Sequence, residues 1–115
     1  MGDVLGTPGH PIWRVRREVL GLLAELPQTE SRTLDQLLEL GWGLRQSDLR
    51  KGVFPIDSPE VAKRAHYNSI RESVRKTLHF LATYELIEPQ QRPADDNSNW
   101  SITDAGRRLI ASLTD

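Results

Sequence analysis

The chain lacks the features that mark secreted, membrane-spanning and redox proteins. Its 115 residues include no cysteine. Without cysteine there is no disulfide framework, no thiolate zinc ligand and no cysteine nucleophile, so the cytoplasm is the expected compartment. No apolar run approaches the roughly 20 residues that span a bilayer, and residues 1–11 lack the hydrophobic stretch of a signal peptide. We therefore expect a soluble protein with no membrane partner.

An excess of charge is also missing. The chain has 15 Lys and Arg against 16 Asp and Glu, a formal net charge of −1. A near-neutral chain does not by itself indicate a polyanionic partner. A nucleic-acid-binding hypothesis must therefore depend on charge that gathers locally. The length suits one hydrophobic core and is too short for two.

The motifs of common enzyme classes are absent as well. The sequence contains no GxxxxGK[ST] loop, no GxSxG elbow and no GxGxxG turn. The histidines His10, His66 and His79 are far apart, and the last two lack the i, i+4 spacing of a metal pair. Asp95 and Asp96 are typical of a turn rather than of an acid and base pair. We expect no enzymatic activity, no catalytic residue, no metal site and no cofactor.

Hydrophobic periodicity predicts four helices in a single domain over residues 12–115, preceded by a flexible arm over residues 1–11. Thr33 and Gln36 form a capping-box pattern, and the second helix is expected to stop at Gly41. Ser58 and Pro59 are a strong helix start. An ordered connection with one helical turn is expected over residues 41–57. The predicted helices cover residues 12–26, 33–40, 59–84 and 104–113.

Two short strands and a turn-rich tip separate the last two helices. Leu86 to Glu88 and Trp100 to Ile102 have strand character, and residues 90–99 between them are rich in turn formers. The expected fold class is mainly α with a small antiparallel β-hairpin. The predicted core contains one apolar residue or more from each helix: Leu23, Leu38, Val74, Leu81 and Ile110.

Two C-terminal segments resemble the winged helix-turn-helix DNA-binding superfamily. They are LHFLATYELIE at 78–88, which is similar to the end of a recognition helix and the first wing strand, and WSITDAGRRLI at 100–110, which is similar to the second strand and the closing helix. The connection between the second and third helices is similar to that in the N-terminal winged-helix domain of Mrr-type restriction proteins. Glu85 stands where such proteins often have glycine, so the helix must end without a glycine in the left-handed conformation.

The resemblance implies that residues 59–84 form a recognition helix that enters duplex DNA. Residues 58–84 carry five basic residues and two acidic ones, a local excess of three. At 100° per residue, several polar side chains lie opposite the apolar stripe, with two arginines along one edge. Arginine can bridge guanine, asparagine can bridge adenine, and lysine or serine can bind phosphate. The predicted DNA-binding residues are Asn68, Ser69, Arg71, Glu72, Arg75, Lys76 and His79.

Other interpretations of this helix stay open. The charges can simply solvate an amphipathic helix. Asp95 and Asp96 at the hairpin tip would be repelled by phosphates, so either the wing stays off DNA or the protein does not bind DNA. The leading function is duplex DNA binding, specific or nonspecific, as a transcriptional regulator or a DNA-binding module. The alternative is a winged-helix protein-interaction module in a larger DNA-maintenance or defence complex.

A homodimer is expected because duplex operators are often palindromic and a small reader gains affinity from two copies. The first helix carries Trp13 and Leu20 beyond its inward stripe. These residues, together with Leu109, Ile110 and Leu113 of the closing helix, supply the expected pairing surface. The competing interpretation is that Trp13 and Leu20 only widen the buried face of the first helix.

Overall fold

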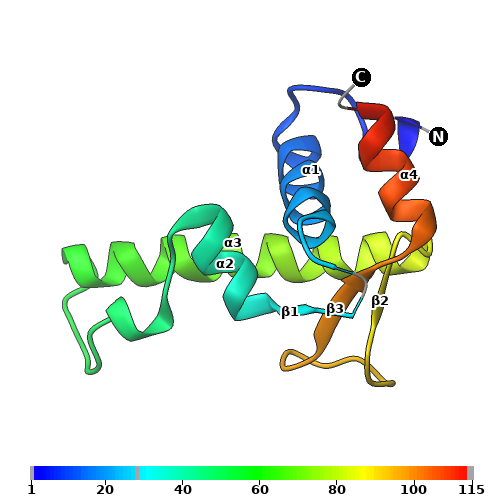
Figure 1. Ribbon diagram of the computed structural model, residues 1–115. Helices are drawn as coiled ribbons and strands as arrows, with labels where there is room; N and C mark the ends of the chain where they lie inside the picture. Colours follow the sequence, from blue (N-terminus) through cyan, green and yellow to red (C-terminus); the bar gives the residue numbers. More distant parts are fainter. Residues whose placement is uncertain (1, 28, 114–115) are drawn as a thin grey trace.

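The computed structural model describes residues 2–27 and 29–113. This part of the chain is mainly helical, with a small antiparallel sheet of three strands (Figure 1). The helices are α1 (Pro11–Ala24), α2 (Leu34–Trp42), α3 (Pro59–Thr83) and α4 (Asp104–Leu113), and two 3₁₀ turns cover η1 (Gly2–Leu5) and η2 (Gln46–Asp48). The strands are β1 (Arg32–Thr33), β2 (Ile87–Pro89) and β3 (Asn99–Ile102).

The sheet contains the expected hairpin and a strand that periodicity did not indicate. β3 is the central strand, with β1 on one side and β2 on the other. Ile87 faces Ile102 across the hairpin, and Arg32 faces Trp100 on the other side of β3. β1 has two residues, which is too few to show a period of two. Its Thr33 serves both as a strand residue and as the N-cap of α2.

The predicted caps are confirmed. The Thr33 hydroxyl accepts from the Gln36 amide at 3.2 Å, and the Gln36 side chain accepts from the Thr33 amide at 2.9 Å. The Ser58 hydroxyl accepts from the Val61 amide at 3.3 Å at the start of α3. The end predicted for α2 is wrong: the helix passes Gly41, reaches Trp42 and ends at Gly43, whose φ of 65° is the left-handed conformation that glycine tolerates.

The end of α3 is closed without glycine. Glu85 adopts a φ of 59°, and the Leu86 amide donates to the Leu81 carbonyl at 3.1 Å. The Thr103 hydroxyl donates to the Glu85 carbonyl at 2.6 Å and also accepts from the Gly106 amide at 3.1 Å, at the start of α4. These bonds fix the direction in which the chain leaves α3 and enters the hairpin.

α1 and α4 lie side by side on one side of α3, and α2 packs beside the middle of α3 (Figure 1). Leu23, Leu38, Val74 and Leu81 are completely buried in one cluster, as predicted, whereas Ile110 is only partly buried against it. Arg107 donates from its guanidinium to the Ala24 and Leu26 carbonyls at 3.3 and 2.6 Å. Arg107 thus ties α4 to the C-terminal end of α1.

The expected flexible arm over residues 1–11 needs correction. Leu5 is completely buried in the core, and the Val4 carbonyl accepts from the Arg16 guanidinium at 3.3 Å. α1 begins at Pro11, and the His10 side chain caps it by accepting from the Ile12 amide at 3.2 Å. The signal for an arm was the glycine and proline content, which does not reveal that one leucine reaches the core.

Candidate nucleic-acid interface

α3 buries one face and exposes the opposite one, in the register that the sequence predicted. Tyr67, Val74, Thr77, Leu78 and Leu81 are its buried residues. On the other face Asn68, Ser69, Lys76 and His79 are exposed, while Arg71, Glu72 and Arg75 are partly exposed. The seven predicted residues therefore share one accessible side of α3.

Arg75 is occupied by a carboxylate on its own helix. Its Nε donates to Glu72 Oε2 at 3.0 Å, and its Nη2 donates to Glu72 Oε1. This two-point contact lowers the pKa of Glu72, chiefly through the hydrogen bond from Arg75, and it raises the pKa of Arg75 for the same reason. Glu72 therefore orients the Arg75 side chain, although it is also partly exposed to solvent.

Arg71 is occupied by a carboxylate from the hairpin. Its Nη2 lies 3.5 Å from Asp96 Oδ2, and Asp96 also contributes to raising the pKa of Arg75. Sequence reasoning placed Asp96 at the hairpin tip but missed this contact, because nothing in periodicity reports that the tip folds back over α3. The acidic tip is thus paired rather than free.

Asp95 has a different task from its neighbour. Its Oδ1 accepts from the Asn97 amide at 2.8 Å, and its own amide donates to the Ser98 hydroxyl at 2.8 Å. Ser98 is buried and its amide donates to the Asp95 carbonyl at 3.2 Å. The expected turn is confirmed: Asp95 holds the tip in shape, which leaves the Asp96 carboxylate to face α3.

A cleft of about 630 Å³ separates the end of α3 from the hairpin. The His79 ring stands edge-on to the buried Trp100 ring, with 5.7 Å between the ring centres. Arg92 enters the same cleft from the hairpin. Arg92 is a cation that the sequence interpretation left out, although a basic residue within a turn-rich tip was the available signal. The full lining is His79, Ala82, Thr83, Pro89, Arg92, Pro93, Ala94 and Trp100.

The N-terminal third of α3, residues 59–66, projects beyond the core together with the connection that precedes it. It contains no buried residue. The guanidiniums of Arg50 and Arg64 lie 5.9 and 5.1 Å from the centre of the Phe54 ring. Val53 is fully exposed and Ile56 is 92% exposed. The residues that the structure describes therefore leave Val53 and Ile56 in contact with solvent.

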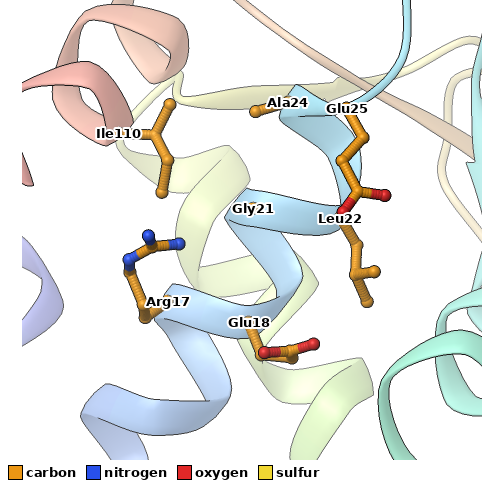
Figure 2. Close-up of a pocket in the computed structure, with 7 residues that line it drawn as sticks. All are labelled: Arg17, Glu18, Gly21, Leu22, Ala24, Glu25 and Ile110. Carbon is orange, nitrogen blue, oxygen red and sulfur yellow. The ribbon is translucent and has the colours of Figure 1, made fainter. Parts of the chain in front are cut away.

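The surface expected to pair two copies is largely used inside the chain. Leu20 is completely buried and Leu109 is 4% exposed, so neither is available to a partner. Trp13 is half-buried against the same core, which favours the interpretation that these residues widen the buried face of α1. What remains between α1 and α4 is a groove of about 340 Å³ (Figure 2). Gly21 is part of its lining, and in this view Arg17 and Ile110 stand on one side of Gly21.

Phe80 lies off the apolar stripe of α3 and packs on α1. The Arg16 guanidinium of α1 lies 3.6 Å above its ring, and the Tyr84 ring lies 5.0 Å away. Trp100 belongs to the core, and Trp42 packs against it.

Comparison with known proteins finds no match in family models, in curated proteins or in solved structures. In the part of the chain that the structure describes, no helix combines the length and the apolar character needed to cross a membrane. Across the same residues, no group of three or more His, Asp or Glu side chains is placed to hold a metal ion.

Proposed function

We propose that this chain is a winged-helix domain that binds duplex DNA through α3. The support from the fold is the order α1, β1, α2, α3, β2, β3 with β3 in the centre of the sheet, which is the arrangement of a winged helix. A hairpin that directly follows the candidate recognition helix is the wing of that fold. One departure is the connection between α2 and α3, which covers residues 43–58 and is much longer than the three- or four-residue turn of a simple helix-turn-helix.

The observation that carries the proposal is the accessible polar face of α3 on a helix with a positive charge excess. Residues 58–84 hold five basic and two acidic side chains in a chain whose net charge is −1. From Asn68 to His79 the face extends about 17 Å at 1.5 Å per residue, and a major groove about 12 Å wide admits a helix. This surface is long enough to read several base pairs.

The side chains supply suitable chemistry for both parts of DNA recognition. Asn68 suits base edges, because a carboxamide can pair with adenine, and Arg71 suits either a guanine edge or a phosphate, because its guanidinium can bind both. Lys76 and Ser69 suit phosphates, which position a protein on the duplex. Arg92 and His79, on either side of the cleft, suit a phosphate of the strand that would pass between α3 and the wing.

A salt series on the binding of a nonspecific duplex tests the proposal. Each phosphate contact releases bound cations from DNA, and the slope of log K against log salt is about −0.9 for each contact. We expect a slope of several units between about 50 and 200 mM salt. No measurable binding at about 50 mM salt, or binding that salt does not weaken, would contradict the proposal.

The second candidate function is a winged-helix module that binds another protein within a DNA-maintenance or defence complex. Two observations favour it: Val53 and Ile56 are exposed on one projecting connection, and Arg71 and Arg75 already have carboxylate partners. The salt series separates the candidates, because an apolar protein interface has no counterions of DNA to release.

The proposal assigns binding to this chain and no catalysis, cofactor or small-molecule ligand. A homodimer remains part of it, since two copies would present two α3 helices to half-sites about one turn apart. Sedimentation at micromolar concentration tests the dimer, and a mass that stays at 13.1 kDa would exclude it. The proposed location is the cytoplasm, which suits a chain without cysteine.

A further inference from the structure

We infer that the acidic hairpin tip competes with DNA: Asp96 occupies the position of a DNA phosphate on Arg71 and must leave before α3 can bind the duplex. This inference depends on the proposed function, because it concerns the regulation of the same face of α3. It starts from one contact, the 3.5 Å approach of Asp96 Oδ2 to Arg71 Nη2.

The hairpin tip is built to present this carboxylate. Asp95, Asn97 and Ser98 bond to one another and shape the turn. Asp96 takes no part in that network, and the contact with Arg71 is its one ion pair within residues 2–27 and 29–113. A residue that shaped the turn would be needed there whatever its neighbours, whereas Asp96 is directed at the helix.

A carboxylate and a phosphate compete directly for arginine. The guanidinium fork binds both through the same donors, so Arg71 cannot make its full set of bonds to Asp96 and to a phosphate together. Arg71, Arg75 and Lys76 contribute three positive charges to the exposed face, and Glu72 and Asp96 contribute two negative ones. With the tip in place, the face offers phosphates about one net positive charge rather than two.

The contact is weak enough to be reversible. The side chain of Arg71 is 29% exposed and that of Asp96 is 52% exposed, and an ion pair of this kind contributes little to stability because water and salt screen it. The strands β2 and β3 hold the base of the hairpin, and the cleft of about 630 Å³ behind the tip leaves space beside α3. Because Asp96 takes no part in the bonds that shape the turn, its side chain can turn away from Arg71 while the sheet stays paired.

The test compares nonspecific duplex binding by the wild type, Asp96→Asn, Arg71→Ala and the double variant. Asp96→Asn keeps the shape of the side chain and removes its charge. We expect it to raise affinity about threefold to tenfold, because DNA no longer has to displace a carboxylate from Arg71, and to change the salt slope by less than one unit, because the wild type also frees Arg71 when it binds. In the Arg71→Ala background the same change should have less than half of that effect on the logarithm of affinity.

The matched control is Glu88→Gln, which removes one negative charge from the same hairpin. Glu88 is exposed on β2, and it forms no ion pair with a described residue. We expect its effect on affinity to be less than twofold, since an exposed carboxylate that pairs with no cation of α3 is screened by water and salt. Equal gains from Glu88→Gln and Asp96→Asn would overturn the inference, because net charge alone would then explain both.

The remaining outcomes separate this inference from the proposed function. If the wild type binds and Asp96→Asn binds no more tightly, the inference is wrong and the proposed function stands. If the gain is as large in the Arg71→Ala background, the competition does not act through Arg71. If none of the proteins binds duplex while thermal melting shows that all are folded, both the proposed function and the inference fail.

Discussion

The two parts of α3, a projecting part over residues 59–66 and a packed part over residues 67–83, share one backbone but are stabilised differently. Residues 67–83 bury Tyr67, Val74 and Leu81 among other side chains, whereas residues 59–66 bury none. Residues 67–83 are held by the core of the molecule. Residues 59–66 are helical because their own sequence favours a helix, with a Ser58 cap, a proline at the first position and few poor helix formers.

The projecting part makes the molecule longer than its size requires. The radius of gyration is 15.3 Å and the longest dimension is 47 Å. A compact domain of 100 residues has a radius of gyration of about 13 Å. Arg64 and Glu60 tie the projecting part to the connection before it through the Arg50 carbonyl and the Arg50 side chain. The stability of the fold should therefore come from residues 67–83 of α3. We expect substitutions there to change the free energy of unfolding more than substitutions in residues 59–66.

The largest effect should come from Leu81→Ala in the packed part. Leu81 is completely buried, and its truncation removes apolar contacts and leaves a cavity. We expect a loss of about 2 to 5 kcal/mol in the free energy of unfolding, measured by urea titration. Lys63→Ala is the control in the projecting part and should stay within about 0.5 kcal/mol of the wild type. An unchanged unfolding midpoint for Leu81→Ala would refute the register of α3.

A pair of glycine substitutions should give the next largest difference. A Cβ on Gly106 would lie 2.2 Å from the Leu86 carbonyl oxygen, just after the packed end of α3. We expect Gly106→Ala to cost roughly 1 to 3 kcal/mol because the backbone must shift. On Gly21 a Cβ would meet the mobile end of the Arg17 side chain at 2.9 Å. Gly21→Ala should therefore be neutral or stabilise by up to about 1 kcal/mol; equal losses would show that the close approach is not the cause.

Glu85→Gly should stabilise the packed end of α3 by about 0.5 kcal/mol. Glu85 has a φ of 59°, which costs a side chain about 1 to 2 kcal/mol, and the greater freedom of glycine in the unfolded chain offsets part of the gain. Urea unfolding with an unchanged m-value would report it. A loss of stability would mean that the Glu85 side chain has a stabilising role that its contacts do not reveal.

Phe54→Ala should have the smallest effect on global stability, within about 0.5 kcal/mol, because Phe54 contacts the projecting part and not the core. It should still loosen that part. We expect faster hydrogen exchange for the amides of residues 62–66 and unchanged exchange for residues 74–82. If exchange accelerates equally in both segments, the two parts of α3 are one cooperative unit and the comparison fails.

Sequence predicted most of what depends on local chemistry. The Thr33 and Ser58 caps, the turn at Asp95 and the buried face of α3 follow from residues close together in the chain, and all are confirmed. Non-local features were missed. β1 forms only because β3 offers it an edge, and the burial of Leu5 requires a core built from residues far along the chain. Leu20 is also buried, where an exposed pairing surface was expected.

The candidate site divides in the same way. The accessible side of α3 could be predicted because helical spacing fixes which residues share a face. The pairing of Arg71 with Asp96 could not, because 3.6-residue periodicity says nothing of where a hairpin tip comes to lie. Charge counts along a helix therefore overstate its free positive charge whenever another segment supplies carboxylates.

The most direct test of the central claim is the salt dependence of duplex binding by the triple variant in which Arg71, Arg75 and Lys76 become alanine. Its control removes three positive charges from α1 and α4 instead, at Arg14, Arg17 and Arg108. We expect the α3 variant to stay folded, to bind more weakly and to lose about one unit of salt slope for each phosphate contact removed, one to three units in total, whereas the control changes the slope by less than one unit. Wild-type affinity and slope in the folded α3 variant would contradict DNA binding through α3.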